Sequence, residues 1–194
     1  MICDNLDFLE TLRLSLRNEV GSCIEIGAGH GDMTRLMMPI AKDAGGKVLV
    51  IDPFEEGWSD MPPSYGEPYP YSIFHNSLKT YIEDESLILF KCPSNDPSLP
   101  KKLVQHSPIR FAYVDGLQYK EAVLEDLCLM QDLRVPYVIV DDYTRETEIS
   151  QVPLAVKEFL ETSDYELLGT GANPLGQGRV LAFLRLEKHD KNSV

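Results

Sequence analysis

The sequence lacks an apolar run long enough to cross a membrane, and its N-terminus lacks the basic and then apolar layout of a signal peptide. These two absences predict a cytoplasmic protein with no membrane partner. Cysteine is also scarce: four residues are scattered along the chain, without a C-x-x-C pair or a histidine at zinc spacing. This spacing argues against a structural zinc site and predicts reduced thiols.

Positive charge is the next deficit, because 18 Lys and Arg residues stand against 31 Asp and Glu residues, giving a formal net charge of −13. No basic stripe interleaved with aromatic residues offsets this charge, so a nucleic-acid partner is not expected. The acidity otherwise needs no function beyond solubility. With 194 residues, 43% of them hydrophobic and 25% charged, the chain is expected to form a single globular domain over residues 1–194.

The most informative segment is an apolar run over residues 22–27. Its last residue, Gly27, is the first of three alternate glycines, and the other two are Gly29 and Gly31. This pattern predicts a buried strand that turns sharply into a helix, where a ligand can approach the backbone closely. A dinucleotide-binding fingerprint would need its third glycine at position 32, which is Asp32. An oxidoreductase that binds NAD is therefore disfavoured, whereas an ordinary tight turn stays open as an alternative.

Together with Glu25, two positions before the first glycine, this pattern resembles motif I of class I S-adenosylmethionine-dependent methyltransferases. Asp52 ends a second apolar run, 25 residues after Gly27, where a carboxylate can accept the hydroxyls of a ribose. Its alternative is a solvated acid at a strand end. Glu25 is expected either to pair with backbone amides or the cofactor's ammonium, or to be a buried structural acid. The candidate cofactor-binding residues are Glu25, Gly27, Ala28, Gly29, Gly31, Asp52, Pro53 and Asp115.

Strand and helix patterns alternate along the rest of the chain, and they predict an α/β fold: a doubly wound, seven-stranded, mostly parallel sheet with a C-terminal antiparallel hairpin. This layout is the one associated with the class I methyltransferase sheet. Residues 1–20 are expected to hold an N-terminal helix over 4–19, capped by Asp4 with Asp7 in its first turn. The segment 53–75, rich in proline and aromatic residues, interrupts the alternation and is interpreted as a lid loop rather than a spacer. The glycine-rich segment 169–178 is interpreted as a plain hairpin connection.

Three carboxylates follow two successive predicted strands: Asp115 follows one, and Asp141 and Asp142 follow the next. If the strands are neighbours, these acids lie close enough to converge on Mg²⁺, which would relieve their mutual repulsion. In the alternative, Asp141 caps a helix and Asp142 is solvated.

Two sequence blocks, 115–127 and 138–143, resemble the D-G-D-H-S-Y-E…D-L and F-D-D-Y blocks of the macrocin O-methyltransferase-like family. Asp52-Pro53-Phe54 also resembles that family's second strand end. The resemblance implies magnesium at Asp115, Asp141 and Asp142, and methyl transfer to a hydroxyl group of a small molecule, often a sugar or a natural-product ring.

The chain departs from this family at Leu117 and Gln118, which replace an aspartate and the histidine expected to act as the base. A carboxamide cannot take a proton near neutral pH. Either Asp115 or Asp142 then accepts the proton of a metal-bound hydroxyl, or His75 supplies the base. The remaining alternative is a protein that binds S-adenosylmethionine without turnover. Because the chain has little surface for substrate recognition, a homo-oligomer that completes the pocket is a further expectation.

Overall fold

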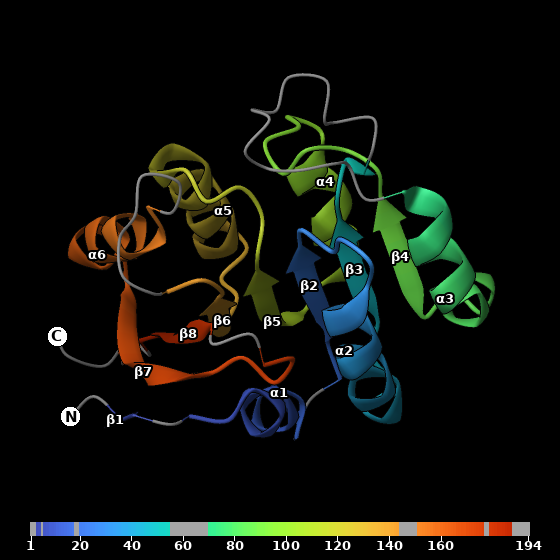
Figure 1. Cartoon of the computed structure of the whole chain (residues 1–194), viewed down its shortest axis with the longest axis horizontal. Coiled ribbons are helices and arrows are strands. Elements are labelled where there is room, and N and C mark those ends of the chain that lie inside the picture. Colours follow the sequence, from blue (N-terminus) through green and yellow to red (C-terminus); the bar gives the residue numbers. More distant parts are fainter. Residues whose placement is uncertain are drawn as a thin grey trace, which may run out of the picture.

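A computed structural model describes residues 3–4, 6–17, 20–54, 70–143, 151–176 and 179–187. Within these ranges one eight-stranded sheet runs in the order β1-β7-β8-β6-β5-β2-β3-β4 (Figure 1). Its strands are β1 (Cys3–Asp4), β2 (Ser22–Ile26), β3 (Val48–Ile51), β4 (Leu87–Phe90), β5 (Ile109–Val114), β6 (Tyr137–Val140), β7 (Tyr165–Ala172) and β8 (Val180–Leu186). The helices are α1 (Phe8–Leu16), α2 (Asp32–Asp43), α3 (Tyr71–Glu83), α4 (Leu99–Leu103), a 3-10 helix (Val104–His106), α5 (Lys120–Asp132) and α6 (Val152–Thr162).

The centre of the sheet is parallel, and its register brings four strand ends to one edge. Ile26 at the end of β2 pairs with Ile51 of β3 on one side and Val114 of β5 on the other. Val114 in turn pairs with Val140 of β6. The strand order reverses between β2 and β5, which is where open α/β sheets bind their ligands. Since β8 pairs antiparallel with both β6 and β7, the predicted mostly parallel sheet with a C-terminal antiparallel hairpin is confirmed. The two-residue β1 is an additional strand, so the sheet has eight strands and not the seven predicted.

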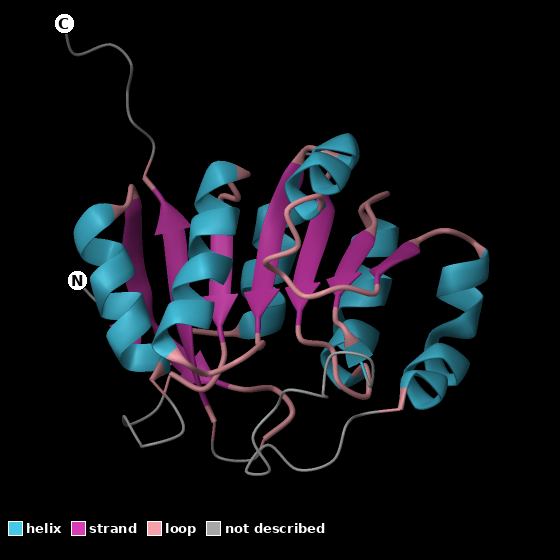
Figure 2. Ribbon diagram, turned by 90° about the horizontal axis from the view of Figure 1, so that it is seen from above, coloured by secondary structure: helices cyan, strands magenta, loops and turns pink. Residues whose placement is uncertain are grey.

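Helices cover both faces of the sheet, as Figure 2 shows. Ile24 and Ile26 of β2 face the apolar layer that contains α4, α5 and α6. Cys23 of the same strand packs in the opposite layer, with α1, α2 and α3. Strands buried on both faces appear in sequence as continuous apolar runs, which is why these strands could be predicted.

The N-terminal helix is shorter than predicted. It covers Phe8–Leu16, and its N-cap is Asp7, whose carboxylate accepts a hydrogen bond from the Glu10 backbone N–H. Asp4 does not cap this helix. It belongs to β1, which pairs in parallel with β7 through a partner far along the chain, and no local pattern indicates such a strand.

The lid prediction is wrong for residues 71–75, which form the first turn and a half of α3. Phe74 and Leu78, four residues apart, are both buried, and the Phe74 ring lies 5.1 Å from that of Phe54. This apolar spacing explains the helix and was obscured by the prolines before it. Residues 55–69 of the predicted lid lie outside the described ranges.

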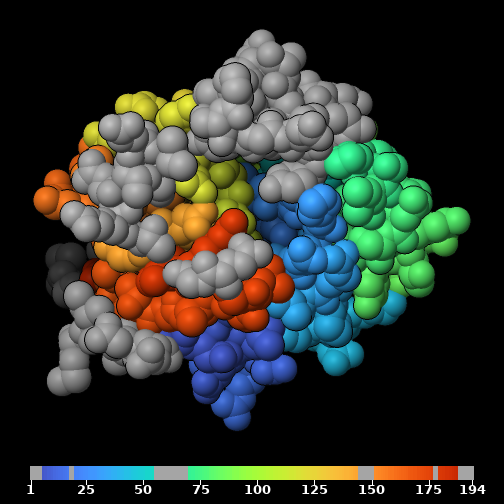
Figure 3. All heavy atoms as spheres, in the orientation of Figure 1, coloured from blue at the N-terminus to red at the C-terminus, as the bar shows by residue number. Residues whose placement is uncertain are grey.

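The β7–β8 hairpin lies against the N-terminal segment. The Leu6 backbone N–H donates to the Thr170 carbonyl at 2.9 Å, and in Figure 3 the orange-red hairpin lies directly beside the dark blue α1 segment. None of the helices in the described ranges is long and apolar enough to cross a lipid bilayer.

Candidate active site

A cavity of about 340 Å³ opens at the edge of the sheet where β2, β3, β5 and β6 end. Its size falls within the range of about 300–1,000 Å³ that is usual for small-molecule sites. Residues of the β7–β8 hairpin close one side. The lining residues are Glu25, Gly27, Ala28, Gly29, His30, Asp32, Met33, Asp52, Pro53, Tyr113, Asp115, Gly116, Leu117, Gln118, Asp141, Asp142, Asn173, Leu175 and Arg179.

The glycine turn forms the floor between β2 and α2. Gly27 has a φ of +79°, and a Cβ at this position would lie 2.1 Å from the Asp115 carbonyl oxygen, so only glycine fits. Gly31, the N-cap of α2, has a φ of +83°, and a Cβ there would lie 2.8 Å from Leu78. Gly31 does not line the cavity, and it allows α2 and α3 to pack closely instead.

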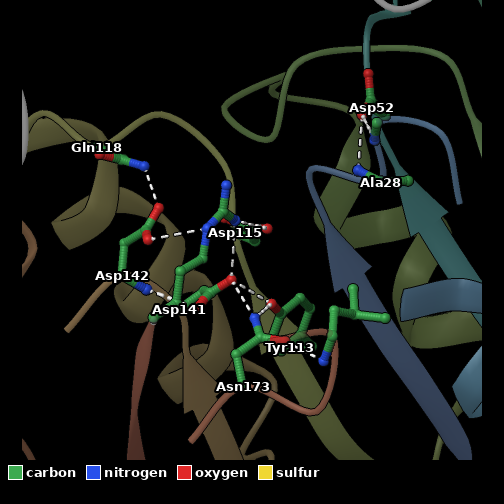
Figure 4. A network of polar contacts seen from close by, with 11 residues as sticks. Ala28, Asp52, Tyr113, Asp115, Gln118, Asp141, Asp142 and Asn173 are labelled. Carbon is green, nitrogen blue, oxygen red and sulfur yellow. Dashed lines mark hydrogen bonds and ion pairs between the residues drawn. The ribbon is translucent and has the colours of Figure 1, made fainter. Parts of the chain in front are cut away.

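Asp52 holds this turn in place from the end of β3. Its Oδ2 atom accepts hydrogen bonds from the backbone N–H groups of Ala28, at 2.7 Å, and Gly29, at 3.1 Å (Figure 4). Its Oδ1 atom accepts one from the Phe54 N–H at 2.6 Å. The two carboxylate oxygens offer about four lone pairs, so Asp52 can bond the turn and still accept from a ligand hydroxyl.

Glu25 is a fully buried acid that faces the cavity from β2. Its Oε2 atom accepts a hydrogen bond from the Thr34 hydroxyl at 2.5 Å, whereas its Oε1 atom has no hydrogen-bond partner among the described residues. Burial raises the pKa of this carboxyl to about 8; the Thr34 bond opposes the shift and the charge of Asp52 adds to it. Glu25 therefore presents a desolvated oxygen to whatever fills the cavity.

This raised pKa predicts a pH-dependent stability. Between the unfolded pKa of about 4.5 and the folded pKa of about 8, the folded state retains a proton that the unfolded chain has released. The contribution of Glu25 is therefore fully present below the lower value and is lost as pH rises through the upper one. We expect Glu25→Gln to show a smaller fall in unfolding free energy than wild type between about pH 5 and 8, measured by urea denaturation.

Asp126 provides a second test of the same effect away from the cavity, because burial also raises its pKa, to about 7, and it does not line the cavity. Asp126→Asn should likewise reduce the pH dependence. A wild-type curve parallel to that of Glu25→Gln over this range would show that Glu25 does not hold the proton.

Asp141 is the centre of the polar network on the other side of the cavity. Its side chain is fully buried, and its Oδ2 atom accepts hydrogen bonds from the Tyr113 hydroxyl at 2.6 Å and from Asn173 Nδ2 at 2.8 Å (Figure 4). Its Oδ1 atom accepts from the Asp142 backbone N–H at 2.7 Å. Both carboxylate oxygens of Asp141 therefore already accept hydrogen bonds from donors of this chain.

Arg179 lies among the three acids Asp115, Asp141 and Asp142, here called the carboxylate cluster. Its Nη1 atom is 3.3 Å from Asp141 Oδ2 and 3.7 Å from Asp115 Oδ2, and its Nε atom is 3.5 Å from Asp142 Oδ1. Gln118 Nε2 donates to the other oxygen of Asp142.

Burial, with the neighbouring Asp141 and Asp142 charges, raises the pKa of Asp115 well above its usual range, and Arg179 opposes this shift. Burial and the charge of Asp141 also raise the pKa of Asp142. Both carboxyls therefore hold a proton more readily than an exposed aspartate does.

These contacts do not fit a magnesium ion. The ion takes oxygen ligands at about 2.0–2.1 Å. Both oxygens of Asp141 and of Asp142 already face hydrogen-bond donors or the Arg179 guanidinium, and Asp115 Oδ2 faces the same guanidinium. Within the described ranges, no group of three or more His, Cys, Asp or Glu residues is arranged to hold a metal ion. Asp115, Asp141 and Asp142 come together as predicted, but around a cation of the chain itself.

Most of the predicted site residues meet at this cavity: of those named from the sequence, only Gly31 and His75 are not among its lining residues. His75 lies on α3, where its ring is 5.4 Å from that of Tyr71. The described structure therefore does not bring it to the carboxylate cluster.

Sequence reasoning missed Tyr113, Asn173 and Arg179. Tyr113 lies inside a strand interpreted only as core. One argument could have identified Arg179. A strand that pairs antiparallel with β6 begins beside the end of β6, so the first residues of that strand lie next to Asp141 and Asp142. In the structure, the Val180 carbonyl accepts a hydrogen bond from the Tyr143 N–H.

Neither a protein-family model nor a curated protein sequence matches the chain, so the specific resemblance to the macrocin O-methyltransferase-like family stays a prediction. Solved structures do match. The cofactor-bound protein Rv0187 from MTB has a TM-score of 0.65 at 13% identity, over 92% of this chain and 78% of that one. The O-methyltransferase TomG from Streptomyces achromogenes, in complex with SAM, has a TM-score of 0.61 at 13% identity, over 92% and 79%.

CalS11, a TDP-rhamnose 3'-O-methyltransferase, has a TM-score of 0.58 at 16% identity, over 91% of this chain and 77% of its own. Identities this low establish the architecture and nothing finer. The chain therefore has the Rossmann-like fold of the class I methyltransferases.

Proposed function

We propose that this protein is an S-adenosylmethionine-dependent methyltransferase that modifies a hydroxyl group of a small molecule. The observation that carries the proposal is the cavity at the strand-order reversal, with the glycine turn on one side and the carboxylate cluster on the other. Such a cavity provides one place for a cofactor and an adjacent place for an acceptor.

The residues on the glycine side fit the cofactor. Gly27 and Gly29 leave room for it to lie against the backbone, and Asp52 stands where it can accept hydrogen bonds from ribose hydroxyls. The buried Oε1 atom of Glu25, without a partner among the described residues, suits the ammonium of the amino-acid end. Bound S-adenosylmethionine supplies an activated methyl group, so the chain needs mainly to position the acceptor and exclude water.

The carboxylate cluster supports chemistry at a hydroxyl. Asp115 and Asp142 line the cavity, and burial with the neighbouring negative charge raises the pKa of each, which makes each a better proton acceptor than an exposed aspartate. The Gln118 carboxamide cannot do so, and it instead fixes the orientation of Asp142. We assign the base to Asp115 or Asp142.

Two considerations favour a small-molecule acceptor over a nucleic acid. The acidic surface and the acidic cluster disfavour polyanions such as nucleic acids. Among proteins with this fold, CalS11 acts on a TDP-rhamnose and TomG is involved in tomaymycin synthesis, and both are O-methyltransferases. A hydroxyl on a sugar or a natural-product ring is therefore the acceptor class we propose.

Isothermal titration calorimetry tests the cofactor assignment. We expect S-adenosylmethionine to bind and NAD not to bind. Asp52→Ala should weaken the binding about 10- to 100-fold, because it removes the hydrogen bonds that hold the turn and a polar ligand contact. The matched control is Asp84→Ala, an exposed acid paired with Lys42 outside the cavity, which should bind like wild type.

Binding of NAD in place of S-adenosylmethionine would overturn the proposal. Catalysis is measured separately, as formation of S-adenosylhomocysteine with panels of hydroxylated sugars and phenols. Cofactor binding without product from any acceptor would favour the alternative of a non-catalytic binding protein.

A further inference from the structure

The carboxylate cluster contains a built-in cation. Three carboxylates from two neighbouring strand ends would repel one another, and the guanidinium of Arg179 lies within 3.3–3.7 Å of all three. This group keeps its positive charge at any pH a protein tolerates, so deprotonation cannot remove the positive charge from the cluster. The charge that a divalent metal would supply is therefore partly present already.

The other contacts of the cluster also argue against a bound metal ion. Tyr113, Asn173 and Gln118 each direct a donor O–H or N–H at a carboxylate oxygen. A metal ligand must instead offer a lone pair toward the ion. Each of these bonds uses a carboxylate lone pair that would otherwise be available to an ion, and Asp141 has donors on both of its oxygens.

The backbone fixes Arg179 in this position. Its carbonyl oxygen accepts a hydrogen bond from the Asn173 N–H at 3.1 Å, and the next carbonyl, of Val180, accepts one from the Tyr143 N–H at 2.8 Å. The first bond closes the β7–β8 hairpin, and the second ties the start of β8 to the segment that follows β6, two residues after Asp141. Backbone hydrogen bonds therefore place Arg179 next to the carboxylate cluster, although its side chain is 38% exposed to solvent.

We propose that Arg179 is the resident cation of this site, that it excludes divalent metal ions from the carboxylate cluster, and that methyl transfer in this chain needs no metal. The part about metal exclusion is independent of the proposed function; the part about methyl transfer rests on it.

Manganese binding, followed by calorimetry and by the electron paramagnetic resonance signal of free Mn²⁺, tests metal exclusion without any need for turnover. Arg179→Met removes the charge and keeps a side chain of similar length, so the emptied cluster should bind Mn²⁺ at least about tenfold more tightly than wild type. Arg179→Lys retains a cation and should bind no better than wild type. Arg185→Met is the matched control: it changes the net charge equally, but Arg185 pairs with Glu166 outside the cavity.

Wild-type binding of Mn²⁺ that disappears in Asp142→Asn would overturn the proposal, and so would equal Mn²⁺ affinities of Arg179→Met and Arg185→Met. If Arg179→Met is too unstable to titrate, its melting temperature is compared with and without millimolar MnCl₂: a rise that Arg185→Met does not share supports the proposal, and no rise contradicts it.

Once an acceptor is identified, wild-type turnover should be unchanged after treatment with EDTA. Loss of turnover that Mg²⁺ restores would contradict the metal-free reaction. Absence of cofactor binding would remove the proposed function but would leave the manganese result standing.

Discussion

Replacing Gly27 with alanine is expected to lower the free energy of unfolding by about 3–5 kcal/mol and to abolish measurable binding of S-adenosylmethionine. The new Cβ would lie 2.1 Å from the carbonyl oxygen of Asp115, a residue whose backbone N–H is held by the Ile26 carbonyl at the end of β2. Neither partner can move by rotating a side chain, so the turn and the end of β5 must separate. In a domain of this size the loss corresponds to a fall of roughly 10–15 °C in melting temperature.

Gly176 separates the two causes of this loss. Its φ of +81° matches the +79° of Gly27, but a Cβ at position 176 would meet no atom of the described residues within 4 Å. Gly176→Ala should therefore cost only the backbone strain, about 1 kcal/mol, and leave cofactor affinity unchanged. If both variants melt at the same temperature, the contact with Asp115 does not determine the need for glycine.

The two strands that flank this turn could be predicted from the sequence, whereas the N-terminal strand could not. The runs over 22–27 and 47–52 predict parallel strands because both of their faces are buried, and the structure confirms β2 and β3 there. The N-terminal segment was predicted less well, because Cys3–Asp4 becomes a strand only through pairing with β7. Such long-range pairing leaves no periodic pattern in so short a segment.

The candidate site could likewise be predicted only in part. Asp115, Asp141 and Asp142 could be brought together from sequence, because residues that follow neighbouring parallel strands share an edge. The chemical identity of their partner could not be obtained from this argument. Three acids indicate a cation but do not specify a metal, and the cation next to them is Arg179, which directly follows the segment 169–178 interpreted as a plain hairpin connection.

Asp141 and Asp142 are adjacent in sequence, yet their substitution by asparagine should affect stability to very different extents. Asp141→Asn is expected to lower the free energy of unfolding by about 2–4 kcal/mol, because one amide oxygen cannot replace two carboxylate oxygens that both accept from donors of the chain. The NH₂ group of the new side chain would then face an N–H or O–H donor in a fully buried position.

Asp142→Asn should change the unfolding free energy by less than about 1 kcal/mol, or raise it slightly, because the raised pKa of Asp142 shows that its charged form is already disfavoured. Asparagine also tolerates the left-handed backbone at this position, where φ is 52°. Urea denaturation at neutral pH measures both variants. Equal losses would mean that the hydrogen bonds to Asp141 do not hold the edge of the sheet together, and a larger loss for Asp142→Asn would move the centre of the network to that residue.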